Sequence, residues 1–271
     1  AMGTMLQRFG LSSGECPELW NVEHREAVLQ VHKLYVEAGS EILGTNTFGG
    51  SRLKLGAYGL SDRLRELNAA GVSVAREAAG PDRFVAGSMG PTGHFIEPLG
   101  ELAFDEAADV FAEQASSLVE AGADVILLET FSDLTEVRAA VTGALRSGAP
   151  VFCTMTFDTG GRTMMGVDPA TAARELADAG VSVAGANCGL GPAETLRILL
   201  VMKEGARTPL MAQPNAGLPV IVDGCTTYNS TPEEMAEYAV QFVRNGVNIV
   251  GGCCGSTPEH IRAMAQAVRS V

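Results

Sequence analysis

The sequence has few basic residues and no long apolar run. Lys and Arg number 19 against 32 Asp and Glu, which gives a formal net charge of −13. This balance argues against nucleic acid and against an anionic membrane surface as partners, because both are bound through basic patches. No apolar run approaches the roughly 20 residues of a membrane-spanning helix. No signal-peptide pattern opens the chain either, so we expect a cytoplasmic protein.

Cysteine is also scarce, with six residues in a chain of 271. Without an extracellular marker this number does not suit a disulfide framework, and it favours a metal site or a reactive thiol. Two phosphate-binding signatures are missing as well, because neither Gly-x-Gly-x-x-Gly nor Gly-Lys-Ser/Thr follows a predicted strand. Apolar residues nevertheless make up 46% of the chain, which is enough for a sizeable core.

A short phrase with a central Gly recurs along the chain. Its copies lie at 37–43, 120–126, 178–184 and 244–250. In each copy we expect an amphipathic helix to end, the Gly to take the left-handed conformation just after it, and a buried strand to begin. The phrase therefore predicts a repeated helix–strand unit.

These repeated units predict an α/β fold. Helices are expected at 24–38, 62–79, 105–121, 133–146, 169–179, 192–204, 232–245 and 257–269, and strands near 41–46, 83–88, 124–129, 150–155, 182–187, 208–212 and 247–251. The spacing favours one domain, residues 1–271, folded as a (β/α)8 TIM barrel whose first strand lies mostly upstream of Ala1. An open doubly wound sheet is the alternative, and the missing nucleotide-binding loops disfavour it.

Three cysteines follow predicted strands at the end of the barrel where function is expected. They are Cys188, Cys253 and Cys254. Neighbouring side chains of a regular strand point to opposite faces, but three flanking glycines let the backbone around the adjacent pair leave the pleat. Three thiolates with an open fourth position are typical of catalytic zinc. The sequence therefore predicts a Zn²⁺ site.

The other cysteines and the histidines are not expected to carry this chemistry. Cys153 and Cys225 are interpreted as small apolar core residues, and Cys16 either as another or as an exposed thiol without a role. His24, His32 and His260 fall within predicted helices as surface or packing residues, whereas His94 lies in a loop that can approach the site.

Polar side chains at other strand ends are candidates for ligand binding. Glu129 ends the apolar run 125–128, and a carboxylate there needs either a ligand ammonium group or an Arg partner. Asn187 and Asn215 flank the predicted metal site. Thr45 and Ser88 lie at the ends of the first two predicted strands.

Three sequence phrases at predicted strand ends resemble those of the zinc-dependent homocysteine S-methyltransferase family. They are Gly-Ala-Asn-Cys at 185–188, Pro-Asn-Ala-Gly-Leu-Pro at 214–219, and Gly-Gly-Cys-Cys-Gly-Ser-Thr-Pro-Glu-His-Ile at 251–261. The opening Ala-Met-Gly-Thr-Met and the Thr-Asn-Thr-Phe phrase at 45–48 are similar too, so the resemblance covers nearly the whole chain. It is strongest to the homocysteine domain of cobalamin-dependent methionine synthases, and it implies a (β/α)8 barrel.

The resemblance also implies roles for the candidate residues. Cys188, Cys253 and Cys254 would hold zinc, with Asn215 as the fourth ligand when no substrate is bound. Glu129 would bind the amino group of homocysteine, and Asn187 would orient the amino acid; Thr45 and Ser88 complete the expected substrate-binding set. The family usually has Asp-Gly before Ala-Met-Gly-Thr, and that Asp contacts the substrate amine; it is absent from this sequence, so either the chain is trimmed or this contact is lost.

The expected reaction is methylation of homocysteine to methionine. We expect cobalamin to act as methyl carrier on a partner or another domain, in a corrinoid- or folate-linked protein, because this chain has no Asp-x-His-x-x-Gly phrase for binding a corrinoid. The alternative is a stand-alone enzyme that uses a small donor such as S-methylmethionine or betaine. A zinc hydrolase and a redox or metal-storage domain are the competing classes. The hydrolase is disfavoured because no His or carboxylate adjoins the three cysteines in sequence.

Overall fold

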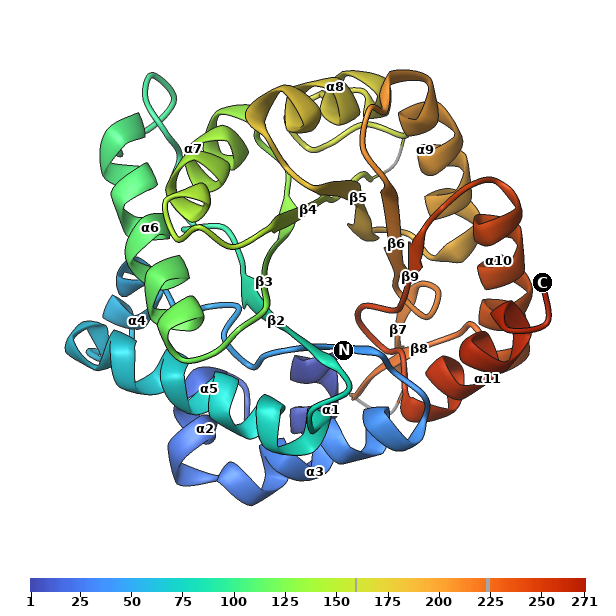
Figure 1. The fold of residues 1–271 in the computed structure, drawn as a ribbon, viewed down its shortest axis with the longest axis horizontal. Helices are drawn as coiled ribbons and strands as arrows, with labels where there is room; N and C mark the ends of the chain where they lie inside the picture. Colours follow the sequence, from blue (N-terminus) through green and yellow to red (C-terminus); the bar gives the residue numbers. More distant parts are fainter. Residues whose placement is uncertain (159, 223–224) are drawn as a thin grey trace.

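The computed structural model describes residues 1–158, 160–222 and 225–271 and shows helices arranged around a curled sheet (Figure 1). The parallel strands are β1 (Ile42–Gly44), β2 (Phe84–Met89), β3 (Val125–Phe131), β4 (Val151–Met155), β5 (Val183–Cys188), β6 (Leu210–Pro214) and β9 (Ile249–Val250). The helices that follow them are α5 (Leu64–Ala79), α6 (Phe104–Glu120), α7 (Leu134–Leu145), α8 (Pro169–Ala179), α9 (Pro192–Gly205), α10 (Pro232–Arg244) and α11 (Pro258–Val268), and α3 (Arg25–Glu37) precedes β1.

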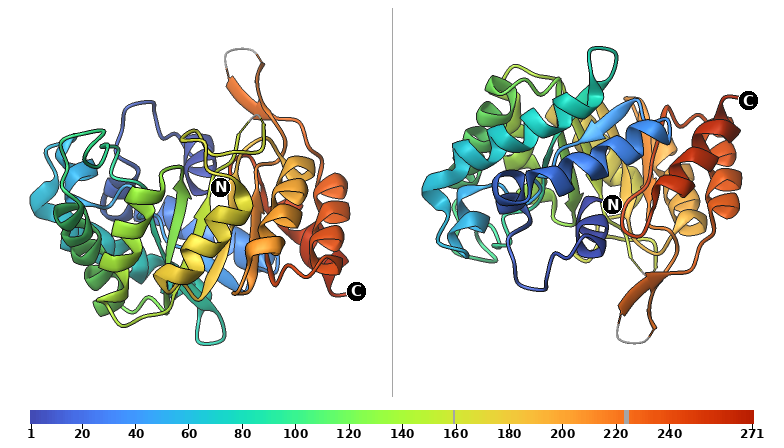
Figure 2. Two further views of the ribbon diagram at one scale, coloured as in Figure 1. Left: turned by 90° about the horizontal axis from the view of Figure 1, so that it is seen from above. Right: turned by 90° about the horizontal axis from the view of Figure 1, so that it is seen from below.

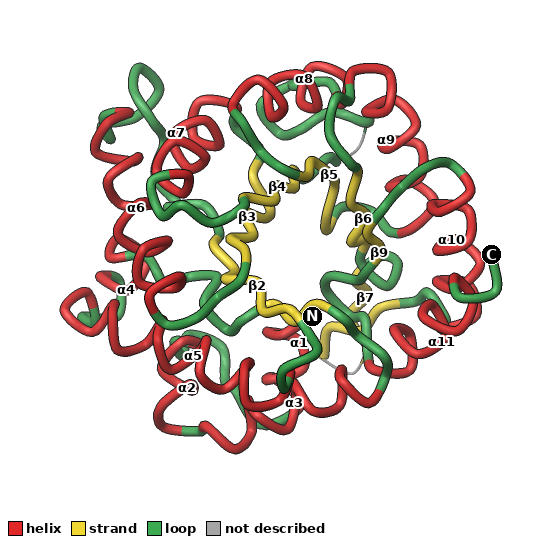
Figure 3. The backbone as a smooth tube through the Cα atoms, in the orientation of Figure 1, coloured by secondary structure: helices red, strands yellow, loops and turns green. Residues whose placement is uncertain are grey.

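The sheet is the inner wall of a barrel. Its strands pair in parallel in the order β1-β2-β3-β4-β5-β6-β9, and they form a ring inside the helices (Figure 3). No strand among the described residues lies between β9 and β1, and residues 2–8 form the helix α1 (Met2–Arg8) instead. The predicted α/β barrel with an incomplete first position is therefore confirmed.

The helix–Gly–strand units have the predicted backbone conformations. Gly39, Gly122, Gly180 and Gly246 all have positive φ, from 88° to 103°. Each lies just after a helix and just before a strand, as the recurring phrase requires. The predicted helices at 232–245 and 257–269 are also present, and Thr231 and Thr257 cap them, each with Pro in the first turn.

Alternation along the strands separates two apolar layers. In β3, Ile126 and Leu128 pack in the layer between sheet and helices, whereas Val125 and Leu127 belong to the cluster inside the barrel. Because side chains alternate along a strand, Glu129 continues the inward-facing series. Glu129 is therefore a polar side chain that faces into the barrel at the carboxyl end of β3. It forms part of the floor of the candidate site described below.

Several elements were not predicted. The short helices η1 (Pro17–Leu19), α2 (Trp20–Glu23), α4 (Arg52–Gly56) and η2 (Ser61–Arg63) lie in connections. The strands β7 (Pro219–Val222) and β8 (Cys225–Tyr228) form an antiparallel hairpin that projects from the barrel after β6 (Figure 2). Within the described parts of the chain, no helix is long and apolar enough to cross a membrane.

Candidate metal centre and substrate site

The structure brings the three predicted cysteines together. The sulfur of Cys188 lies 3.4 Å from that of Cys253 and 3.9 Å from that of Cys254. All three sulfur atoms lie within 4.8 Å of one another. Thiolates at these separations suit a single soft divalent cation, and they form a cluster that can hold a metal ion.

The backbone around Cys253 and Cys254 leaves the regular strand, as we predicted from the flanking glycines. β9 ends at Val250, after which the N–H of Cys253 donates to Pro214 O at 2.8 Å. The carbonyl of Cys254 accepts from Ala216 N at 2.9 Å. Cys188 itself has φ of 61°, an uncommon conformation for a residue with a side chain. Hydrogen bonds to the segment at the end of β6 therefore hold the backbone of Cys253 and Cys254 in this irregular conformation.

The charges of the cluster favour a bound cation. Hydrogen bonds with Cys253 and Cys254, together with burial, raise the pKa of the Cys188 thiol above its usual range. Hydrogen bonds from Cys188 and Cys253 lower the pKa of Cys254. Three thiols this close cannot all ionise without compensation, and a divalent cation would let them do so because it offsets their mutual repulsion.

Asn215 lies directly against the cysteine cluster. Its Nδ2 donates to Gly189 O at 2.9 Å, and its Oδ1 accepts from Cys254 N at 3.0 Å. An amide oxygen has two lone pairs, so Oδ1 keeps one for a further partner. The position suits the role expected for Asn215 as fourth ligand, which stays a prediction.

Thr45, Ser88 and Glu129 form a connected polar group on the floor. The Ser88 hydroxyl donates to Glu129 Oε1 at 2.5 Å, and the Ser88 N–H donates to Thr45 Oγ1 at 3.0 Å. Burial, with a further contribution from negative charge at Cys253, raises the pKa of Glu129 to about 7. Among the ion pairs of the described residues none includes Glu129, so the Arg partner considered from the sequence is not found.

Asn187 connects this floor to the cysteines. Its Oδ1 accepts from Thr130 N and from Thr154 Oγ1, both at 2.9 Å. Its Nδ2 donates to Thr130 Oγ1 at 2.8 Å and to Cys253 Sγ at 3.7 Å. Protein atoms therefore fill all four hydrogen-bonding positions of this amide, which fixes β3, β4 and β5 relative to the metal ligands.

Sequence reasoning missed Tyr228 and some of the contacts within the site. Thr130 and Thr154 lie at predicted strand ends, but nothing in the sequence showed that they hold Asn187. Tyr228 at the end of β8 has its ring against Gly255, and burial together with the nearby thiols raises its pKa to about 12. The Asp-Gly dipeptide at 223–224, flanked by β-branched residues, was an available signal for this hairpin.

The remaining cysteines lie apart from the cluster. Cys153 is fully buried in the main core, as predicted. Cys16 is buried too, and its thiol donates to Glu18 at 3.3 Å, so it is a core residue rather than an exposed thiol. The side chain of Cys225 lies outside the described residues.

The histidines have structural positions. His32 is buried in α3, and His260 closes the capping box of α11 through Nδ1 while Nε2 donates to Ser230 O. His24 stacks on Trp20. His94 is exposed in the loop after β2, and its backbone N–H donates to Thr92 Oγ1 at 3.1 Å.

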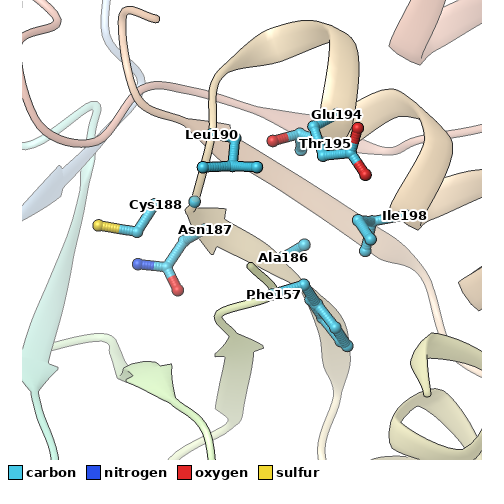
Figure 4. Close-up of a pocket in the computed structure, with 9 residues that line it drawn as sticks. Phe157, Ala186, Asn187, Cys188, Leu190, Glu194, Thr195 and Ile198 are labelled. Atoms are coloured by element: carbon cyan, nitrogen blue, oxygen red, sulfur yellow. The ribbon is translucent and has the colours of Figure 1, made fainter. Parts of the chain in front are cut away.

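A pocket lies beside the metal ligands at the end of β5. Figure 4 shows Asn187 and Cys188 on one side of it, and Glu194, Thr195 and Ile198 from the start of α9 on the other. The Cys188 sulfur points away from the α9 residues.

Comparison with protein families identifies the class of this barrel. The model of the family described as homocysteine S-methyltransferase matches residues 1–268. The chain therefore belongs to the homocysteine S-methyltransferase family, in agreement with the resemblance drawn from the sequence.

Curated relatives place the chain near methionine synthases. It is 38% identical over 290 residues to the methionine synthase of Mycobacterium tuberculosis (strain ATCC 25618 / H37Rv), with 100% of this chain and 24% of the relative covered. The methionine synthase of Mycobacterium leprae (strain TN) is 37% identical over 287 residues, with 99% and 24% covered. The chain thus spans about a quarter of the length of these relatives.

Solved structures share the fold. The homocysteine methyltransferase MmuM from Escherichia coli matches in its apo form with a TM-score of 0.76 at 24% identity. Its metallated form matches with a TM-score of 0.77 at 25% identity. Each match covers 98% of this chain and 93% of the other.

Proposed function

We propose that this chain binds homocysteine at a zinc ion and activates it to accept a methyl group, forming methionine. The observation that carries the proposal is the cluster of Cys188, Cys253 and Cys254, with sulfurs within 4.8 Å, in a member of this family. A metallated form of the related MmuM supports a metal in this fold. Three cysteine ligands favour zinc among the metals a protein holds.

The ion supplies one chemical step that no side chain here provides. A free thiol has a pKa near 8.5, so it is mostly protonated at neutral pH. A bound Zn²⁺ would stabilise the deprotonated thiol of the substrate, and the thiolate is the form that attacks an electrophilic methyl group.

The floor residues would bind the amino acid part of the substrate. Glu129 is half-buried with one oxygen held by Ser88, so its carboxylate is available for the substrate ammonium. An ammonium there would also replace the Arg or Lys partner that Glu129 lacks, and would favour the ionised carboxylate. Thr45 holds Ser88, and Asn187 fixes the distance between this floor and the metal ligands.

The methyl group would come from a separate corrinoid- or folate-linked protein or domain, with cobalamin as its carrier. Apolar side chains are exposed in the loops around the barrel mouth: Phe48 after β1, Met164 after β4, Leu190 after β5 and Leu218 after β6. Met164 is 77% exposed. An apolar rim around a polar site suits the docking of a large partner more than the capture of a small, charged donor such as betaine or S-methylmethionine.

Metal analysis and calorimetry test the proposal together. Purified protein should bind about one zinc ion per chain, and homocysteine should release close to one proton on binding near neutral pH. Calorimetry in buffers of different ionisation enthalpy counts that proton. If zinc is bound but no proton is released, activation of the thiol by the metal is wrong.

Single substitutions test the ligand assignment. Cys254→Ser should abolish tight zinc binding, because a neutral hydroxyl is a far poorer ligand than a thiolate. The matched control is Cys153→Ser in the core, which should keep its zinc. Full zinc retention in Cys254→Ser would rule out the proposed ligand set.

A further inference from the structure

Loop 45–51 runs from the end of β1 to the N-cap of α4 and is largely buried. Five of its seven residues are buried, although connecting segments usually run over the surface. Buried backbone groups need hydrogen-bond partners. The partners of this loop therefore show which elements fix its position.

Side-chain amides from three helices hold the carbonyl groups of the loop. The carbonyls of residues 46, 47 and 50 each accept a hydrogen bond of 2.8 Å, from Asn21 of α2, Gln114 of α6 and Asn68 of α5 respectively. All three amide side chains are at most 1% exposed. The helices around the barrel therefore set the position of this loop.

Two glycines allow the loop to lie this close to its supports. A Cβ atom added at Gly50 would lie 2.5 Å from Oδ1 of Asn68. One added at Gly71, within α5, would lie 2.6 Å from the methyl carbon of Thr47. Gly within a helix lowers its stability relative to Ala, so its presence at position 71 favours a role in this close packing.

The loop in turn holds the backbone of Ser88. Thr47 Oγ1 donates to Ser88 O at 2.7 Å, and the Ser88 N–H donates to Thr45 Oγ1 at 3.0 Å. The two threonine hydroxyls are joined by a hydrogen bond of 2.5 Å. The Ser88 hydroxyl donates to Glu129. A continuous path of hydrogen bonds therefore leads from the helix layer, through this loop, to the carboxyl group on the floor of the site.

Gln114 begins this path, and it is a costly residue for the core. Its Nε2 donates to Thr47 O and also to Oδ1 of Asn68, at 3.2 Å. Its Oε1 is buried and has no hydrogen-bond partner among the described residues. A buried oxygen without a hydrogen bond lowers stability, so the group that Nε2 holds explains this Gln better than core stability does.

We propose that Gln114 is a positioning residue for the substrate site. By holding Thr47 it fixes Ser88, and through Ser88 it fixes the Glu129 carboxyl group where the ammonium group of homocysteine binds. The inference rests on the proposed function, in which Glu129 binds that ammonium group. A charge-assisted hydrogen bond depends on the placement of its acceptor, so a displaced Glu129 binds the ammonium group less well while the metal ligands keep theirs.

The experiment compares Gln114→Met with the unaltered protein. Met keeps the length of the side chain and removes the amide. Thr47 O keeps its hydrogen bond from Gly50 N, and removal of an unbonded buried oxygen offsets loss of the donor to Asn68. We therefore expect little change in the midpoint of urea unfolding and an unchanged zinc content. Homocysteine should bind about three- to tenfold more weakly, measured by titration calorimetry.

Two further measurements separate positioning from a general structural effect. The deamino analogue of homocysteine, γ-mercaptobutyrate, has the thiol and the carboxylate but no ammonium group, so it should bind Gln114→Met and the unaltered protein equally. In combination with Glu129→Gln, the substitution at Gln114 should not weaken homocysteine binding further, because both changes act on one contact. The control is Ser117→Ala, at a buried position about one turn further along α6, which should bind homocysteine normally.

Two results would overturn the inference. Equal homocysteine affinity in Gln114→Met and the unaltered protein would show that Gln114 does not position Glu129. Equal losses with homocysteine and its deamino analogue, or additive effects with Glu129→Gln, would show a general disturbance of the barrel. If Gln114→Met does not fold, Thr47→Val carries the same test, because it keeps the shape of the side chain and removes the hydroxyl that holds Ser88.

Failure of the proposed function looks different from failure of this inference. It would be seen in the unaltered protein, which would bind no zinc or no homocysteine. It would also be seen in Glu129→Gln alone, which would then bind homocysteine as the unaltered protein does.

Discussion

Glu129 shows how one charged residue is accommodated at the end of an apolar strand. The four preceding residues of β3 are buried, and the alternation of the strand turns the carboxyl group into the barrel mouth. One hydrogen bond from Ser88 does not offset the burial, and the pKa of Glu129 is raised to about 7. Such a carboxyl group binds a cation favourably, because the cation restores its charged form.

Replacing Glu129 with Gln should weaken homocysteine binding and leave zinc in place. The variant keeps the shape of the side chain and removes the charge-assisted contact with the substrate ammonium. Loss of such a contact corresponds to about 1.5–3 kcal/mol, or roughly tenfold to a hundredfold in the dissociation constant. Titration calorimetry with homocysteine measures this, and zinc content is checked in the same samples. An unchanged dissociation constant would return Glu129 to a structural role.

The limits of sequence reasoning are visible among these residues. Cys188, Cys253 and Cys254 could be selected because parallel strands end at one rim, so that positions far apart in sequence meet there. Asn187 could also be predicted as a site residue, but its contacts could not. Its four hydrogen bonds join it to residues of three other segments of the chain. Tyr228 lies against Gly255 from a hairpin that was not predicted.

At the scale of elements, the regular units were predictable and the insertions between them were not. Every predicted helix and strand is present, because each carries its own apolar face and a Gly or a cap at its boundary. The short helices around 17–23 and 52–63 lack that periodicity, since they are too short to show it. The helix α1 occupies a stretch where a strand end was expected, and its Thr4 accepts a hydrogen bond from Gly255.

The helix α3 contains a histidine whose burial should make the fold sensitive to acid. His32 is 1% exposed, and burial lowers its pKa from 6.5 to about 4. In the unfolded chain the same side chain takes up its proton near pH 6.5, so the unfolded state binds more protons between these two values. Stability contributed by neutral His32 is therefore full above about pH 6.5 and is lost as the pH falls toward 4.

Urea unfolding at pH 7 and at pH 4.5 measures this contribution. Between these two conditions His32→Leu should lose about 2–3 kcal/mol less stability than the unaltered protein, because the variant has no side chain to protonate at this position. The control is His94→Leu, which alters an exposed loop position. Parallel losses in His32→Leu and the unaltered protein would show that His32 does not account for acid sensitivity.

At the scale of the whole molecule, the proposed function assigns activation of the substrate to this barrel and delivery of the methyl group to a separate protein or domain. The cysteine cluster, Glu129 and Ser88 lie together at one end of the barrel. The apolar residues Phe48, Met164, Leu190 and Leu218 come from four different loops at that same end. The chain spans about a quarter of the length of the methionine synthases that it matches.

The isolated chain should consequently bind and activate homocysteine but transfer methyl groups slowly from free methylcobalamin. Efficient turnover should require a corrinoid-carrying protein or domain, because docking on the apolar rim holds the methyl group in line with the substrate sulfur, and such positioning lowers the barrier of a two-reactant step. The measurement is methionine formation with methylcobalamin, methyltetrahydrofolate, betaine and S-methylmethionine offered separately, each with and without a carrier domain. Charged substitutions on the rim, Met164→Glu and Leu218→Glu, should slow only the carrier-dependent reaction, while homocysteine binding and proton release stay unchanged. Rapid turnover with betaine or S-methylmethionine alone would instead show that the donor is a small molecule that enters the barrel mouth without a protein partner.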